Sequence, residues 1–242
     1  MAFTRPDAGA RPGETVRQNG RPMKTGQSIQ YGATSAAAVL QVQGLCFAYP
    51  QRELFAQLGV RLWPGVTLVR GGDGCGKTTL LQLLAGAVAA DAGTLQVRDI
   101  ALHQQPLAYR QQVFWADPRA TEFEQTKVRN YFNALPSRYP TFDWPLLGEL
   151  IEGLALAPHL HKPLYMLSTG SKRKVWLAAA FACGAAVTLV DEPFAALDQV
   201  SVAFIRVMLQ EAAGHASRAW VVAHYESLGE DIALATVIDL GD

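Results

Sequence analysis

A glycine-rich stretch at residues 71–79 has the residue types and spacing of a phosphate-binding loop. Its sequence, Gly-Gly-Asp-Gly-Cys-Gly-Lys-Thr-Thr, satisfies the pattern G-x-x-x-x-G-K-[ST]. Glycines let the backbone turn so that successive N–H groups face an anion, and the start of a following helix adds attraction. We expect Lys77 to reach the outer phosphates of a nucleoside triphosphate and Thr78 to coordinate Mg²⁺. The predicted nucleotide-binding residues of the loop are Gly71, Gly72, Asp73, Gly74, Cys75, Gly76, Lys77, Thr78 and Thr79.

The segments on either side of the loop indicate a strand and a helix. Residues 66–69, Val-Thr-Leu-Val, form a short apolar run typical of a buried strand, and the leucines after Thr79 recur with helical spacing. Strand, loop and helix therefore come in the order that phosphate binding requires. A glycine-rich turn without a ligand is the weaker alternative. The loop alone does not distinguish GTPases, kinases, helicases and transport ATPases.

Two adjacent carboxylates, Asp191 and Glu192, follow a second apolar run at residues 185–190. At the C-terminal tip of a parallel strand, Asp191 can lie beside the cation at the loop, and Glu192 can orient a water toward the γ-phosphate. An acidic pair often only caps an element. Its combination with the phosphate loop favours the catalytic interpretation.

A third pattern is Leu-Ser-Thr-Gly-Ser at residues 167–171, before a helix that begins with the basic run 172–174. Small residues at a helix N-terminus can bind an anion. The same pattern also fits a plain helix cap followed by a solvated basic face. Its position shortly before Asp191 favours the anion site.

Together, these motifs resemble those of the ATP-binding cassette (ABC) family over about residues 38–242. Leu-Ser-Thr-Gly-Ser corresponds to the family's Leu-Ser-Gly-Gly-Gln signature. The resemblance implies that Tyr49 stacks on adenine, that Asp198 belongs to the D-loop and that His224 contacts the γ-phosphate. Without it, a lone tyrosine or histidine would indicate a core or turn residue. The catalytic residues that the resemblance implies are Lys77, Glu192 and His224.

In that family, two cassettes pair head to tail and enclose two ATP molecules with Mg²⁺. The resemblance therefore implies a second nucleotide-binding subunit, most simply a homodimer, and separate transmembrane permease subunits. It places the chain at the cytoplasmic side of the inner (plasma) membrane, as a peripheral protein. Short cassettes of this kind resemble those of exporters, including haem exporters. The signature residues expected to act in trans are Ser168, Thr169, Gly170 and Ser171.

Two motifs, the signature and the Q-loop, depart from the family pattern. Thr169 and Ser171 replace the commonest Gly and Gln of the signature but still offer hydroxyl and N–H groups. The glutamine usual in the Q-loop is missing, and Asp117 is the nearest polar residue, which could touch the metal through water. The candidate metal-binding residues are thus Thr78, Asp191 and Asp117. By the same resemblance, residues 117–139 would form the groove that receives a coupling helix of the membrane subunits.

Composition narrows the class of protein. The 242 residues are half hydrophobic, enough for one large domain, and carry zero formal net charge, which gives no electrostatic reason to expect nucleic acid as a partner. Three widely spaced cysteines indicate no disulfide framework and fit a reducing compartment. The longest apolar run, residues 177–190, is shorter than the roughly 20 residues that span a bilayer. Any membrane span is therefore expected from another polypeptide.

The chain divides into a tail and a cassette. Residues 1–36 are rich in Gly, Pro, Arg and Gln and are expected to be disordered, whereas residues 37–242 form the nucleotide-binding domain. The predicted fold is α/β: a P-loop NTPase core with a mainly parallel sheet, an N-terminal antiparallel β subdomain and an inserted helical subdomain at about 105–184. Strands are expected at 39–45, 54–62, 66–69, 94–98, 101–103, 187–190, 219–223 and 237–240, and helices at 128–135, 144–154, 171–183 and 199–213.

The favoured function is the ATP-binding and ATP-hydrolysing subunit of an ABC transporter. One alternative is a non-transport ABC ATPase, such as a DNA-repair or ribosome-associated factor, although the coiled-coil arms, zinc modules and basic patches of such relatives are not seen. Another alternative is a weakly active or binding-only regulatory cassette, suggested by Asp117 and the Thr/Ser signature.

Overall fold

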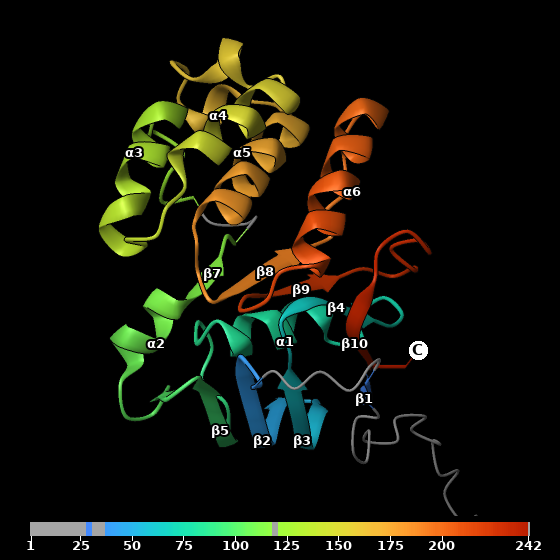
Figure 1. Ribbon diagram of the computed structural model, residues 1–242. Coiled ribbons are helices and arrows are strands. Elements are labelled where there is room, and N and C mark those ends of the chain that lie inside the picture. The colour runs from blue at the N-terminus through green and yellow to red at the C-terminus, as the bar shows by residue number, and fades with distance from the viewer. Residues whose placement is uncertain (1–27, 31–36, 118–120, 242) are drawn as a thin grey trace, which may run out of the picture.

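The computed structural model describes residues 28–30, 37–117 and 121–241. In Figure 1, an antiparallel sheet lies at the bottom, a parallel sheet in the middle and a group of helices at the top. The segment 1–36, expected to be a disordered tail, lies outside the described residues except for Ser28–Gln30, which form strand β1. That short strand pairs with strand β10 at the sheet edge.

The larger sheet of the described residues has the strand order β1-β10-β4-β9-β8-β7, in which β1 is antiparallel to β10 and the other neighbours are parallel. Because parallel strands end at one edge, the loops after β4, β8 and β9 meet there. This edge carries the motifs predicted to bind nucleotide. Besides β1, the strands are β4 Gly65–Arg70, β7 Val113–Trp115, β8 Val187–Asp191, β9 Ala219–Ala223 and β10 Leu234–Asp239.

The smaller sheet is antiparallel and has the order β3-β2-β5-β6. Its central hairpin reverses at residues 50–51, and the turn thus includes Pro50 as expected. The predicted antiparallel β subdomain is therefore confirmed. Its strands are β2 Leu40–Tyr49, β3 Arg52–Leu62, β5 Ala92–Val97 and β6 Ile100–Ala101.

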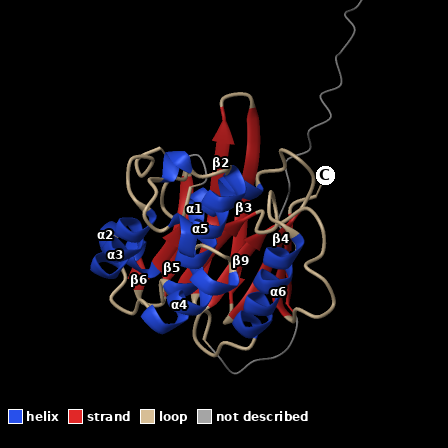
Figure 2. Ribbon diagram, turned by 90° about the horizontal axis from the view of Figure 1, so that it is seen from above, coloured by secondary structure: helices blue, strands red, loops and turns tan. Residues whose placement is uncertain are grey.

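Helix α1 runs between the two sheets, whereas α3, α4 and α5 form the upper helical part of the molecule (Figures 1 and 2). Asp143, Ser168 and Asp198 cap α4, α5 and α6 by accepting a bond from the backbone N–H three residues on. The helices are α1 Lys77–Leu84, α2 Pro106–Gln112, α3 Val128–Arg138, α4 Trp144–Gly153, α5 Thr169–Ala182 and α6 Gln199–Ala213, with 3₁₀ turns η1 Ala157–His159 and η2 Leu164–Met166.

The expectation that residues 105–184 are helical is wrong at one place. Strand β7 lies inside this range and pairs with β8 as the edge of the parallel sheet. Its three residues, Val-Phe-Trp, are too few to show a period of two, so the alternation that identifies longer strands is not available. The helical subdomain begins after β7 rather than at residue 105.

The parallel sheet is buried on both faces. Alternate residues of one strand enter different hydrophobic clusters: Leu68 packs with the upper helices, and Val69 packs with α1 and the antiparallel sheet. Burial on both faces explains why these strands appear in the sequence as continuous apolar runs rather than alternating ones.

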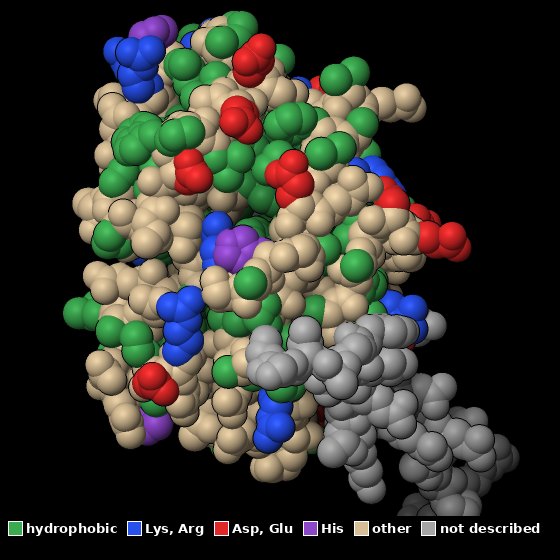
Figure 3. All heavy atoms as spheres, in the orientation of Figure 1, with side chains coloured by type: hydrophobic (Ala, Val, Ile, Leu, Met, Phe, Trp, Pro, Cys, Tyr) green, Lys and Arg blue, Asp and Glu red, His purple; other side chains and the backbone are tan. Residues whose placement is uncertain are grey.

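On the face seen in Figure 3, basic and acidic side chains are interspersed, and hydrophobic side chains gather over the upper helical part. Within the described residues, no helix has both the length and the apolar character needed to cross a membrane.

Candidate nucleotide-binding site

The loop between β4 and α1 depends on backbone conformations that favour glycine. Gly76, at the start of α1, has a φ of 106°, and a Cβ on Gly71 would lie 2.6 Å from the carbonyl oxygen of Gly241. The loop can therefore fold tightly against the end of β10 only with glycine at residue 71.

Lys77 lies across this loop. Its Nζ donates hydrogen bonds to the carbonyl oxygens of Gly71, at 2.7 Å, and Gly72, at 2.9 Å, and the residue is only 8% exposed. The ammonium group is thus held at the centre of the loop, where the pattern predicts the outer phosphates.

Thr78 and Asp191 meet as the sequence predicts. The Thr78 hydroxyl donates to Oδ2 of Asp191 at 2.7 Å, which joins the start of α1 to the end of β8. Burial raises the pKa of the Asp191 carboxyl, and the hydrogen bond from Thr78 opposes that shift. A cation here would offset the cost of burying the carboxylate.

These two oxygen donors fit Mg²⁺, which is usually held by one or two protein oxygens together with phosphates and water. In the described part of the chain, no group of three or more His, Cys, Asp and Glu side chains forms a metal cage. The two oxygens of Thr78 and Asp191 suit a cation whose other ligands are phosphates and water.

Glu192 and His224 follow adjacent strands, β8 and β9, whose last residues are paired in register. Nδ1 of His224 lies 2.7 Å from Oε2 of Glu192, and the backbone N–H of His224 donates to the carbonyl of Val69. The backbone of Glu192 is in the left-handed region, with a φ of 47°. Both side chains are thereby held at the same sheet edge as the phosphate loop.

A cleft of about 660 Å³ lies between the antiparallel sheet and this edge, within the size range of ligand pockets. Tyr49 lines it, about half exposed, and its hydroxyl lies 3.2 Å from Oγ1 of Thr79. Four cleft residues were not predicted: Arg52, Leu54, Gln82 and Arg173. They lie outside the recognised motifs, and no sequence signal identified them.

The signature adjoins the D-loop rather than this cleft. Ser168 caps α5, and a Cβ on Gly170 would lie 2.4 Å from the carbonyl oxygen of Ala196. Lys174 donates to Asp198 at 2.6 Å, which lowers the pKa of that carboxyl. No cleft-lining residue among those described belongs to 168–171, so these side chains do not face the nucleotide site of their own chain.

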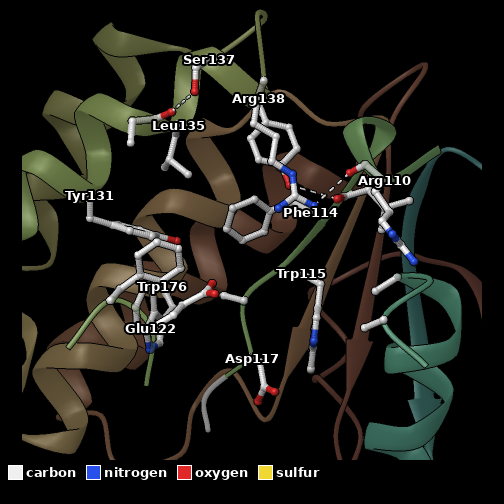
Figure 4. Close-up of a pocket in the computed structure, with 17 residues that line it drawn as sticks. Arg110, Phe114, Trp115, Asp117, Glu122, Tyr131, Leu135, Ser137, Arg138 and Trp176 are labelled. Carbon is white, nitrogen blue, oxygen red and sulfur yellow. Dashed lines mark hydrogen bonds between the residues drawn. The ribbon is translucent and has the colours of Figure 1, made fainter. Parts of the chain in front are cut away.

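A second pocket, of about 420 Å³, lies between β7 and the helices α3 and α5. Figure 4 shows Tyr131, Leu135, Phe114 and Trp176 around it, with Asp117 at one end. Part of the range 117–139 therefore lines a groove as expected. Trp176 and Arg110, from α5 and α2, were not foreseen because they lie outside that range.

The family model described as "ABC transporter" matches residues 57–195. The chain is 32% identical over 188 residues to the "Cytochrome c biogenesis ATP-binding export protein CcmA" of Nitrosococcus oceani, covering 77% of this chain and 86% of the relative. A protein of the same name from Pseudomonas syringae is 30% identical over 209 residues, covering 85% and 97%.

Among solved structures, an ATP-binding subunit of an ABC transporter matches with a TM-score of 0.68 at 19% identity, covering 77% of this chain and 79% of that one. An ABC transporter ATP-binding protein from Pyrococcus furiosus matches with a TM-score of 0.66 at 20% identity, covering 83% and 96%. These structures support the cassette fold, and the sequence relatives favour transport over the DNA-repair and ribosome-associated alternatives. The chain belongs to the ABC transporter family and is an ATP-binding, ATP-hydrolysing subunit of a transporter.

Proposed function

We propose that this chain supplies the energy for export by closing, as a head-to-tail homodimer, on two ATP molecules beneath separate membrane subunits. The observation that carries this proposal is the convergence of Lys77, Asp191, Glu192 and His224 on one sheet edge. Their separation in the sequence makes this meeting a property of the fold.

The hydrolytic roles that we propose follow the family resemblance and are supported by the contacts within the site. Lys77 and the loop N–H groups hold the phosphates, and Thr78 and Asp191 hold Mg²⁺, with Asp117 as a candidate contact through water. When bound, Mg²⁺ neutralises charge on the β- and γ-phosphates. Glu192 would accept a proton from the attacking water, and His224 keeps the carboxylate in place through its 2.7 Å contact. The family resemblance implies that His224 also contacts the γ-phosphate.

The dimer supplies the other half of each site. Residues 168–171 do not line their own chain's cleft, and the N-terminus of α5 is suited to an anion. In the proposed dimer, Ser168, Gly170 and Ser171 contact the γ-phosphate on the opposite subunit, and Asp198 lies in the loop between the two sites.

The groove of Figure 4 is the proposed seat of a coupling helix from a membrane subunit. Tyr131 and Trp176 meet edge to face in its lining, with ring centroids 5.0 Å apart, and Glu122 and Arg138 add charge to the lining. An apolar helix face with a few polar groups fits such a wall. The contact would place this chain on the cytoplasmic side of the membrane.

The relatives' names suggest the transport task. Because both are named as cytochrome c biogenesis ATP-binding export proteins, we propose that this chain energises an export step in that process.

The test compares wild type with Glu192→Gln in the full-length protein. We expect the variant to lose about 10²- to 10⁴-fold in kcat, the range of general-base catalysis, while ATP affinity is kept. Size-exclusion chromatography with Mg²⁺ and ATP should then show a stable dimer. Equal hydrolysis in both proteins would reject the role of Glu192, and a monomer under all conditions would reject the dimer.

A further inference from the structure

Arg173, which belongs to none of the family motifs recognised in the sequence, connects helix α5 to the end of strand β8. One nitrogen of its guanidinium, Nη1, donates to the carbonyl oxygen of Asp191 at 2.9 Å and also to the carbonyl oxygen of Glu192. Arg173 lines the nucleotide cleft. Its two hydrogen bonds, however, go to the backbone of Asp191 and Glu192, the residues that carry the two carboxylates.

The turn that Arg173 contacts has an unfavourable backbone. Glu192 is a non-glycine residue at a φ of 47°, a conformation that persists only when its surroundings hold it. The N–H of Glu192 donates to the carbonyl of Ala223 at 2.9 Å, which ties one side of the residue to β9. Arg173 ties the carbonyl on the other side, so the two contacts together determine where the carboxylate points.

The environment of Arg173 suits this task. Burial lowers the pKa of the guanidinium, and the nearby charges of Asp191 and Glu192 oppose that shift. A charged donor to a carbonyl makes a stronger hydrogen bond than a neutral one. Because an arginine side chain stays charged in proteins, both of its hydrogen bonds to the turn are charge-assisted.

We propose that Arg173 is a positioning residue for hydrolysis: it holds the Asp191–Glu192 turn so that the Glu192 carboxylate meets the attacking water. The inference rests on the proposed role of Glu192. Lys172, which precedes Arg173 on α5, donates to both carboxylate oxygens of Glu124, at 2.6 and 2.8 Å. Glu124 lies in the segment that leads from the groove to α3. The start of α5 is thus joined both to the turn that carries Glu192 and to the groove side of the molecule.

The test uses the full-length chain and steady-state ATP hydrolysis with Mg²⁺ in Arg173→Ala, Arg173→Lys and Glu192→Gln. We expect Arg173→Ala to lower kcat by about 10- to 100-fold, the range for loss of charged hydrogen bonds, while KM for ATP stays within about threefold. Arg173→Lys should recover part of kcat, because an ammonium can still donate to one of the two carbonyls.

Arg206→Ala is the matched control, since Arg206 also donates to a backbone carbonyl, that of Leu228 at 2.7 Å, but lies on α6 away from the cleft. Thermal unfolding of each variant measures the structural effect of losing the arginine. A kcat loss in Arg173→Ala well beyond that in Arg206→Ala, at a similar fall in melting temperature, supports positioning.

Other outcomes overturn the inference. These are a kcat within twofold of wild type, an equal loss in Arg206→Ala, or a raised KM with an unchanged kcat. If Arg173→Ala does not fold, Arg173→Lys decides by the same criteria. If Glu192→Gln hydrolyses ATP like wild type, the proposed role of Glu192 fails instead, and this result is separable because it does not involve Arg173.

Discussion

The nucleotide cleft and the groove beside β7 are built in different ways. The cleft is formed by backbone turns and short polar contacts, such as Lys77 to the loop carbonyls and Thr78 to Asp191. The groove is formed mainly by aromatic and aliphatic side chains, including Phe114, Tyr131 and Trp176. In the first, the chemistry depends on which atoms face the ligand; in the second, recognition depends on shape.

The difference explains why one site keeps a recognisable pattern and the other does not. Phosphate and Mg²⁺ have fixed geometry, so few residue types satisfy them. An apolar wall can be made from many combinations of side chains and can change together with its partner. Asp117, the nearest polar residue to the position where the family usually has a glutamine, lies on the groove side of this divide.

Among the changes in binding that separate the two sites, the largest should come from Lys77→Ala. Removing the ammonium at the centre of the loop should weaken ATP binding by about 100-fold, the upper range for loss of a charged contact. A fluorescent ATP analogue measures the affinity. If the cleft and the groove are separate sites, Lys77→Ala should leave association with the membrane subunits intact in the absence of nucleotide. A loss of that association would contradict the separation of the two sites.

The opposite result is expected for Trp176→Ala. Loss of an aromatic at the centre of an interface typically costs 2 kcal/mol or more, about 30-fold in affinity for the membrane partner, while ATP affinity stays unchanged. Co-purification with membrane subunits measures the affinity for the membrane partner, and the fluorescent ATP analogue measures the ATP affinity. Trp144→Ala is the control, because Trp144 is 48% exposed and contacts Phe142, just before α4, but does not line the groove. Equal losses in both variants would contradict a special role for the groove.

A smaller effect, on stability, is expected from Asp191→Asn. The folded pKa of Asp191 is raised, so its contribution to stability is present below about pH 4 and is lost as pH rises through the folded pKa. The variant should therefore melt a few degrees above wild type at pH 7. The difference in melting temperature should disappear in acid, where the Asp191 carboxyl of the wild type is protonated.

Asp239→Asn is the control for that experiment. The hydrogen bond from the Gly241 N–H, with help from Arg70, lowers the pKa of Asp239. The ionised carboxylate of Asp239 therefore stabilises the fold at pH 7, and Asp239→Asn should lose stability there. Melting curves in the absence of nucleotide measure both. A lower melting temperature for Asp191→Asn at pH 7 would show that burial is not the dominant influence on that carboxyl.

The smallest effect should come from Lys174→Met. Its ion pair with Asp198 lies at the surface, and such pairs contribute little to folding. Melting temperature and monomer stability should stay close to wild type. If ATP-driven dimerisation is weakened all the same, the D-loop needs this pair for assembly rather than for folding.

Much of the architecture could be predicted because its causes are local. The helix expected at 199–213 has those bounds in the structure, and the strand expected at 219–223 does too. Both begin and end at clear signals, with Asp198 as a cap and an uninterrupted apolar run for the strand. Strand β7 was missed because three residues carry too little periodicity.

Contacts between distant segments were harder to foresee. The phosphate loop follows a known spacing, so Lys77 and Thr78 could be named from the sequence. Arg173 and Trp176 contact neighbours that only the fold brings near, Glu192 in one case and Tyr131 in the other. No pattern within α5 itself indicates which of its basic or aromatic residues meets them.

The many contacts of α5 also determine which sequence changes it can accept. Ser168 caps the helix, and Lys172, Arg173, Lys174 and Trp176 each meet a different part of the molecule. A single inserted residue would turn everything after it by about 100°. Substitutions here remove one contact at a time, whereas an insertion or deletion would misalign several at once. Length variation among related chains should therefore be rarer in the first two turns of α5 than substitution.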